Sequence, residues 1–80
     1  MFYVYVLRSK VDSKLYIGFT KNLRKRIREH NLGLVTSTKN RRPFKLVYYE
    51  ASYIMKDAIA REKSLKTGFG RAYLKRRISD

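Results

Sequence analysis

Residues 1–9 of this chain read MFYVYVLRS and residues 14–20 read KLYIGFT, with KVDS between them. β-Branched and aromatic residues dominate both runs, which is typical of strands. The short polar link between the two runs predicts that they pair as a β-hairpin.

One surface of this hairpin is expected to carry three tyrosines and a glycine. Side chains alternate between the faces of a strand, so Tyr3 and Tyr5 share one face of the first strand. Tyr16 and Gly18 share one face of the second, and a loop of about four residues puts both pairs on the same side. A glycine inside a strand often marks a place where a ligand or another chain comes close. We interpret this surface as the floor of a site, although tyrosines also occur in strands simply because they favour them.

The rest of the chain predicts one more strand and three helices from capping residues, apolar periodicity and turn signals. In chain order the segments are a basic helix over 23–30 capped by Asn22 and ending near Gly33, a loop over 32–43, a strand over 44–51, a helix over 54–66 capped by Ser52 and closed by Thr67 and Gly68, and a helix over 71–78. The first strand is the most apolar, so we expect it in the middle of the sheet. The predicted fold class is α+β, a small three-stranded antiparallel sheet flanked by about three helices (β-β-α-β-α-α), in a single domain over 1–80.

The charge of the chain points to a polyanionic partner. Twenty Lys and Arg against six acidic residues give a formal net charge of +14, which destabilises a small fold by self-repulsion unless a polyanion binds. Nucleic acid is the first candidate, because the apolar residues do not form the long amphipathic stripe of a membrane-surface protein. The residues expected to contact nucleic acid are Gly18, Thr36, Thr38, Lys39, Arg41, Arg42 and Lys66.

Composition also limits the setting of the protein. The chain has no cysteine, which excludes disulfides and thiolate zinc sites. No apolar run approaches the roughly 18 residues of a membrane span, and no signal peptide precedes the first strand. We therefore expect a cytoplasmic protein without membrane contact, and a monomer is favoured.

The basic helix over 23–30 turns two polar side chains toward the hairpin. At about 100° per residue, Leu23 and Ile27 define its apolar face, His30 falls between them, and Arg26 lies at the border. An arginine at such a border can merely extend to solvent, and an inward histidine can be a satisfied core residue. The i, i+4 spacing of this pair beside the tyrosine surface favours a functional role.

The helix over 54–66 places one carboxylate on its apolar face. Glu62 falls inside the stripe formed by Met55, Ala58, Ile59 and Leu65, with Lys66 one turn later. A carboxylate turned into a core costs several kcal/mol unless a cation or several donors compensate it. The alternative is an ordinary Glu62–Lys66 pair at the helix rim.

Tyrosine, arginine, histidine and glutamate side chains suit the hydrolysis of a phosphodiester. This reaction needs an activated water and a positive charge close to the phosphate oxygens. The order of these residues along the chain, with Tyr3-Val4-Tyr5, Tyr16-Ile17-Gly18, Arg26, His30 and Glu62, resembles the GIY-YIG nuclease domain over nearly the entire length. It is most similar to small single-domain bacterial members, which are related to the amino-terminal nuclease domain of the excision-repair endonuclease. The second triad is literal, whereas Tyr3 and Val4 replace the glycine and isoleucine of the first.

The resemblance implies an endonuclease that hydrolyses phosphodiester bonds in DNA with one Mg²⁺ or Mn²⁺ ion, structure-selective rather than sequence-specific, in DNA repair or processing. By position, Glu62 would bind the metal, Arg26 would hold the phosphate, Tyr5 or Tyr16 would take the proton from water, and His30 would assist a tyrosine. Phe19 stands where some members carry a lysine. RNA as substrate and a non-catalytic basic nucleic-acid-binding module stay open as alternatives.

Overall fold

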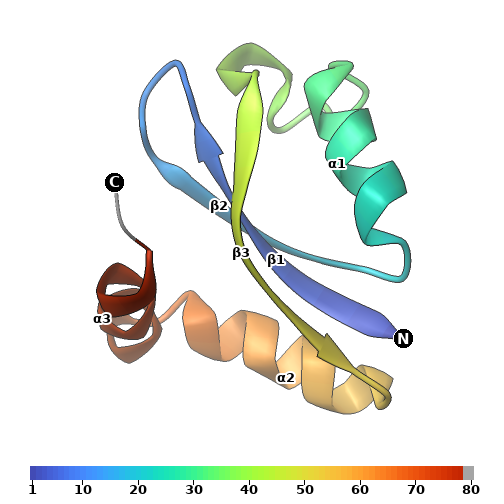
Figure 1. The fold of residues 1–80 in the computed structure, drawn as a ribbon, viewed down its shortest axis with the longest axis vertical. Helices are drawn as coiled ribbons and strands as arrows, with labels where there is room; N and C mark the ends of the chain where they lie inside the picture. The colour runs from blue at the N-terminus through green and yellow to red at the C-terminus, as the bar shows by residue number, and fades with distance from the viewer. Residues whose placement is uncertain (79–80) are drawn as a thin grey trace.

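The computed structural model describes residues 1–78, so residues 79 and 80 of the expected domain lie outside the described part. The strands are β1 (Phe2–Ser9), β2 (Leu15–Thr20) and β3 (Phe44–Ser52), and they form one antiparallel sheet in the order β2-β1-β3. The helices are α1 (Leu23–Asn31), α2 (Met55–Leu65) and α3 (Gly68–Arg77) (Figure 1). The predicted α+β class, the order of elements and the central place of β1 are confirmed.

The alternation along β1 divides the protein into two apolar clusters on opposite faces of the sheet. Tyr5 and Leu7 pack with Phe44 and with residues of α1 on one face. Val4 and Val6 pack on the other face against buried residues of α2 and α3. Figure 1 accordingly shows α1 on one side of the sheet and α2 with α3 on the other. This arrangement lets β1 supply a core residue at every position from 4 to 7, which explains why its sequence is almost wholly apolar.

The register of the hairpin confirms that the tyrosines share a face. Tyr5 lies opposite Gly18, and Leu7 lies opposite Tyr16. Tyr3, two residues before Tyr5, points to the same side. The predicted surface therefore exists, and it faces α1.

Two predicted helix boundaries were wrong. Ser52 does not cap α2, because its hydroxyl bonds to the backbone of Ile54, and Ile54 is the residue that precedes the helix. Thr67 closes α2 as predicted, because its N–H and its hydroxyl both donate to the carbonyl of Ser64. It also caps α3, where its hydroxyl accepts from the backbone N–H of Gly70. As a result α3 begins at Gly68, three residues before the predicted start.

The loop after α1 contains one feature that its composition did not predict. Residues Lys39–Arg41 form a short 3-10 helix, η1. The end of α1 itself agrees with the prediction, because Gly33 follows the C-cap with a φ of 79°, where a side chain is strained. A side chain at Gly33 would also collide with Arg42.

A polar cluster fastens α2 and α3 to β3; we call it the β3 cluster, and it consists of Tyr48, Glu50, Arg61, Tyr73 and Arg77. The Arg61 guanidinium donates to both carboxylate oxygens of Glu50 at 3.0 to 3.1 Å. Tyr48 donates to the same carboxylate and lies 3.0 Å from the Tyr73 hydroxyl. The ring of Tyr73 carries the guanidinium of Arg61 at 4.6 Å and that of Arg77 at 3.6 Å. Each charge in this cluster therefore has a partner of opposite sign or an aromatic face.

Candidate active site

The centre of the candidate site is the phenol of Tyr5, which is 1% exposed. Its ring covers Gly18, where a Cβ would overlap the phenol. The expectation that Gly18 admits nucleic acid is therefore wrong, because the group that comes close to this glycine is the protein's own tyrosine. Gly18 instead allows the Tyr5 hydroxyl to lie over β2.

The Tyr5 hydroxyl is the first member of a buried hydrogen-bond chain. It lies 2.8 Å from Nε2 of His30, and Nδ1 of His30 lies 2.8 Å from the hydroxyl of Thr38. The Thr38 hydroxyl donates to the carbonyl of Val35 at 3.4 Å, so its oxygen accepts from Nδ1. Nε2 is then the acceptor, and the Tyr5 hydroxyl donates a hydrogen bond to it. The chain thus fixes both the tautomer and the orientation of the imidazole.

This chain changes the role expected for Thr38. The side chains of Thr38 and His30 are both fully buried. Thr38 cannot contact phosphate from that position, so the prediction for this residue was wrong, and its hydroxyl orients His30 instead. His30 faces inward as the helical wheel predicted.

The electrostatic environment keeps this chain neutral. Burial, followed by the charge of Arg26, lowers the pKa of His30 below its ordinary value of 6.5. Burial also raises the pKa of Tyr5 above 10.0, and Tyr16 and Glu62 add to this while Arg26 opposes it. Tyr5 therefore keeps its proton at neutral pH, and His30 is uncharged there.

Tyr16 and Arg26 complete what we call the α1 cluster, which consists of Tyr5, Tyr16, Arg26, His30 and Thr38. The ring centroid of Tyr16 lies 5.0 Å from that of His30 and 6.4 Å from that of Tyr5. Unlike Tyr5, Tyr16 is only half-buried. The structure therefore brings the second tyrosine to the same histidine while leaving part of it accessible.

Arg26 lies at the exposed edge of the cluster. Its interaction with the Tyr5 hydroxyl is the first cause that raises the pKa of the guanidinium. It also donates to Glu29 at 3.3 Å, and its side chain is 36% exposed. The charge of Arg26 thus stands between a buried phenol and solvent, as its border position on the wheel predicted.

Glu62 is at a rim and not in a core. Its side chain is 21% exposed, and one carboxylate oxygen accepts from Lys66 at 3.2 Å. The prediction of an inward carboxylate was wrong because the apolar stripe of α2 is narrower than the wheel suggested, with Met55 45% exposed. The charge of Glu62 nevertheless raises the pKa of Tyr5, so Glu62 acts electrostatically on the α1 cluster from the other side of the sheet.

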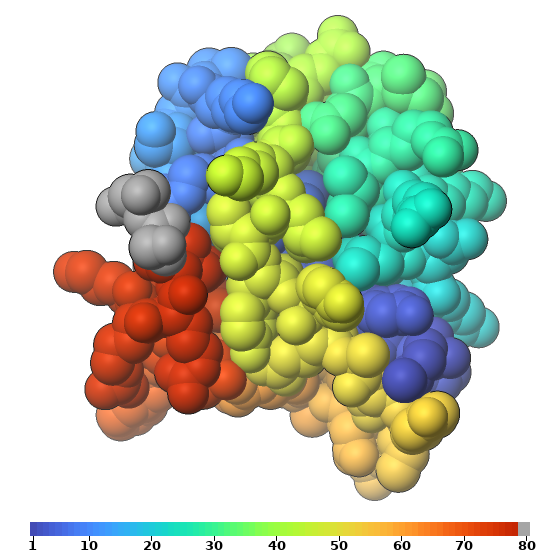
Figure 2. Space-filling model, in the orientation of Figure 1, coloured from blue at the N-terminus to red at the C-terminus, as the bar shows by residue number. Residues whose placement is uncertain are grey.

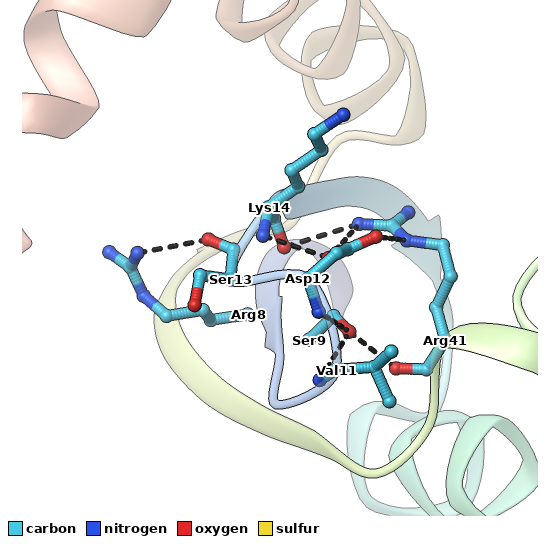
Figure 3. Close-up of polar contacts among 7 residues, drawn as sticks. All are labelled: Arg8, Ser9, Val11, Asp12, Ser13, Lys14 and Arg41. Carbon is cyan, nitrogen blue, oxygen red and sulfur yellow. Dashed lines mark hydrogen bonds and ion pairs between the residues drawn. The ribbon is translucent and has the colours of Figure 1, made fainter.

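The basic loop is only partly available to a phosphate. Arg41 is held by Asp12 at 2.8 Å and by the carbonyl of Lys14 at 3.2 Å, so the loop is tied to the tip of the hairpin (Figure 3). This contact holds the pKa of Asp12 at about 2. Arg41 therefore has a structural partner that the sequence did not predict. The other three proposed contacts in the loop are exposed: Thr36, Lys39 and Arg42.

Ser9 also contributes to this junction. Its buried hydroxyl donates to the carbonyl of Arg41 at 2.5 Å and accepts from the backbone N–H of Val11 and of Asp12 (Figure 3). The loop that supplies Thr38 is thus anchored near η1. This anchoring stabilises the position from which Thr38 reaches His30.

Within residues 1–78, no group of three or more His, Cys, Asp or Glu side chains is arranged to hold a metal ion. A single partly exposed carboxylate fits a hard cation that keeps most of its water ligands, as Mg²⁺ does. Glu62 meets this requirement. No helix in the described part of the chain is long and apolar enough to cross a membrane.

The comparison with protein families decides the assignment. The model of the GIY-YIG catalytic domain matches residues 1–78. This chain belongs to the GIY-YIG family. The match confirms the resemblance, in spite of Tyr3 and Val4 in the first triad.

Relatives of this GIY-YIG domain are small proteins of similar length. The UPF0213 protein CPE1444 of Clostridium perfringens is 46% identical over 67 residues, which make up 82% of this chain and 71% of that protein. The UPF0213 protein SH2523 of Staphylococcus haemolyticus is 44% identical over 66 residues, or 81% and 79% of the two chains. The fold also matches the solution NMR structure of the UPF0213 protein BH0048 from Bacillus halodurans, with 32% identity, a TM-score of 0.57 and coverage of 92% of this chain and 82% of that one.

Sequence reasoning missed the roles of three residues that position the site in this GIY-YIG domain: Thr38, Phe44 and Asn31. Thr38 was assigned to phosphate, and Phe44, whose ring lies 5.9 Å from that of His30, was taken only as a strand residue. Asn31 bonds to both backbone groups of Phe44 and so joins the end of α1 to the start of β3. The polar Asn31 after an amphipathic helix was the only local signal of this junction.

Proposed function

We propose that this GIY-YIG domain is a metal-dependent endonuclease that hydrolyses phosphodiester bonds in DNA. The observation that carries the proposal is the hydrogen bond between Tyr5 and His30, with Tyr16 and Arg26 beside it and Glu62 within electrostatic reach. A basic domain that only binds nucleic acid needs cations on its surface. Its binding gains nothing from the buried, uncharged hydrogen-bond chain of Tyr5, His30 and Thr38.

Arg26 is the residue proposed to hold the scissile phosphate. Its planar guanidinium can bind two non-bridging oxygens and stabilise the charge that develops on them. The single Glu29 contact, between two partly exposed side chains, contributes little and can be exchanged for a phosphate.

Tyr16 is the proposed base. A base must reach the attacking water, and Tyr16 is half-buried whereas Tyr5 is 1% exposed and retains its proton. In its deprotonated form Tyr16 takes one proton from water as the water oxygen bonds to phosphorus and the bond to the leaving oxygen breaks. Tyr5 and His30 then act as positioning residues, because they pack on the Tyr16 ring and fix its place.

Glu62 is the proposed ligand of one Mg²⁺ or Mn²⁺ ion. When bound, such an ion supplies positive charge to the phosphate oxygens and to the leaving oxygen. The Lys66 side chain is 53% exposed, so its ammonium group can move from the Glu62 carboxylate into solvent at little cost in free energy. Lys66 is then free to contact phosphate, as the sequence predicted.

The proposed substrate is DNA selected by its structure, in repair or processing. The test is to incubate the purified protein with labelled single-stranded, duplex, flap and junction DNA in Mg²⁺, in Mn²⁺ and in chelator. We expect cleavage of at least one structured substrate with either metal and none in chelator. Tight binding without cleavage of any substrate would instead support the non-catalytic binding module.

A further inference from the structure

A groove of about 920 Å³ lies between the β1–β2 hairpin and α3. Apolar side chains, including those of Ile17 and Leu74, line most of it. Five cations stand among the lining residues: Arg8, Lys14, Lys66, Arg71 and Lys75. None of the lining residues within 1–78 is acidic, and of the five cations Lys66 is paired with Glu62, so the groove combines an apolar surface with an excess of positive charge.

The groove is continuous with the candidate active site. Tyr16 is one of its lining residues, and the ring of Tyr16 packs on His30 of the α1 cluster on the other face of the sheet. Lys66 also lines it, and its ammonium group bonds to Glu62. A strand of nucleic acid that enters the groove therefore lies next to the proposed metal ligand.

The chemistry of the groove distinguishes between forms of DNA. A duplex presents phosphates on its outside and keeps its bases stacked within, so an apolar hollow offers it no contact beyond charge. An unpaired base exposes its flat apolar faces, and burying them against apolar side chains is favourable in free energy. The flanking phosphates can bind the surrounding cations at the same time. An apolar groove among five cations fits the second case.

We propose that this groove binds an unpaired nucleotide of single-stranded DNA next to the bond that is cut. The base lies against Ile17 and Leu74, and the flanking phosphates contact Lys66, Arg71 and Lys75. The position relative to the cut rests on the proposed nuclease function, but the binding of single-stranded DNA does not.

The test compares two variants of equal charge. Arg71→Ala with Lys75→Ala removes two cations from the groove, and Lys63→Ala with Arg76→Ala removes two exposed cations outside it, so each lowers the net charge from +14 by 2. Affinity is measured by fluorescence anisotropy in chelator, with a labelled single strand and the duplex of the same sequence. We expect the groove variant to weaken single-strand binding about tenfold more than the control variant, with equal losses on duplex. Equal losses of the two variants on single strands would overturn the proposal.

Two measurements on the unaltered protein complete the test. A strand of abasic sites should bind more weakly than oligothymidylate of the same length, because only the latter has bases to place in the groove. Bound oligothymidylate should protect Lys14, Lys66 and Lys75 from acetylation more than Lys63. Equal affinity for the two strands, or equal protection of all four lysines, would contradict the groove.

These results separate the two proposals. Since binding is measured in chelator, a protein that never cleaves DNA but shows the expected groove effects refutes the nuclease function alone. A protein that cleaves DNA while the groove and control variants bind alike refutes the groove alone.

Discussion

The α1 cluster and the β3 cluster use similar residue types on opposite faces of one sheet, but they place charge differently. In the β3 cluster the charges neutralise each other, and Glu50 is bound at once by Arg61 and Tyr48. In the α1 cluster the interior is a neutral chain from Tyr5 to Thr38, and the charged Arg26 stands at its exposed edge. A network whose charges neutralise each other, like the β3 cluster, stabilises the packing of the helices on the sheet. An uncharged hydrogen-bond chain with a cation at its edge, like the α1 cluster, can bind an anion.

Figure 2 shows the face of the molecule on which β3 lies. β3, in yellow-green, runs down the middle of this face with α1 on one side and α3, in red, on the other. The β3 cluster lies where β3 meets α2 and α3. We therefore assign it to stability and the α1 cluster to chemistry, and the predictions below test this division.

The largest contrast is expected between two tyrosines. Tyr16→Phe should lower the rate of DNA cleavage by at least about a hundredfold, because it removes the proposed base while keeping the ring that packs on His30. Tyr48→Phe, which also removes one hydroxyl, should leave the rate unchanged. The measurement is single-turnover cleavage of the best substrate in Mg²⁺, with thermal unfolding of both variants as control. Equal cleavage rates of the two variants would contradict the assignment of chemistry to the α1 cluster and of stability to the β3 cluster.

The second contrast is in stability. Glu50→Gln should lower the free energy of unfolding by about 1–3 kcal/mol, because Arg61 and Tyr48 lose the anion that they share. Glu29→Gln breaks the Arg26 contact and should cost less than about 1 kcal/mol, since that pair is a single contact within α1 and joins no second element. Urea denaturation of both variants measures the difference. Similar small losses would show that the β3 cluster does not hold α2 and α3.

The third contrast is in the pH at which each cluster loses stability. The pKa of His30 in the folded protein is lowered below 6.5, the value expected in the unfolded chain. The contribution of His30 to the free energy of unfolding is therefore complete above pH 6.5, and it is lost as the pH falls through the pKa of the folded protein. Burial alone would raise the pKa of Glu50, but Arg61 and Tyr48 hold it below 4.5, so its contribution is lost only at more acidic pH. Thermal unfolding followed from about pH 8 to about pH 3 should therefore show two separate declines.

Variants assign these two declines. His30→Gln should abolish the decline that begins near 6.5 and keep the acidic one, and Glu50→Gln should do the reverse. A His30→Gln protein that retains the first decline would show that the buried imidazole does not cause it.

The sequence predicted the parts of the fold that depend on local periodicity. The apolar composition of residues 2–9 predicted the central strand, and the alternation of side chains predicted the shared face of the tyrosines. The wheel of α1 predicted the inward His30. Contacts between distant segments were not predictable in this way. Thr38 reaches His30 only because the loop folds back on α1, and Gly18 is covered by a ring on the neighbouring strand.

The wheel of α2 failed for a related reason. A helical wheel ranks positions by angle but does not know how wide a stripe the sheet will cover. Ala58 and Leu65 are buried, but Met55 is largely exposed, so Glu62 lies at the border and pairs with Lys66. Its proposed role as a metal ligand therefore rests on family membership and on its effect on Tyr5 rather than on burial.

The most direct test of the nuclease proposal is the cleavage rate of Glu62→Gln in Mg²⁺, with Asp57→Asn on the same helix as a control of equal charge. Each variant raises the net charge from +14 by 1, so both should bind DNA at least as well as the unaltered protein. Loss of the Lys66 contact should change the free energy of unfolding by less than about 1 kcal/mol. We predict that Glu62→Gln nearly abolishes cleavage while Asp57→Asn cleaves normally. Cleavage by Glu62→Gln at the unaltered rate would show that Glu62 is only half of a rim ion pair and would contradict the proposed metal-dependent mechanism.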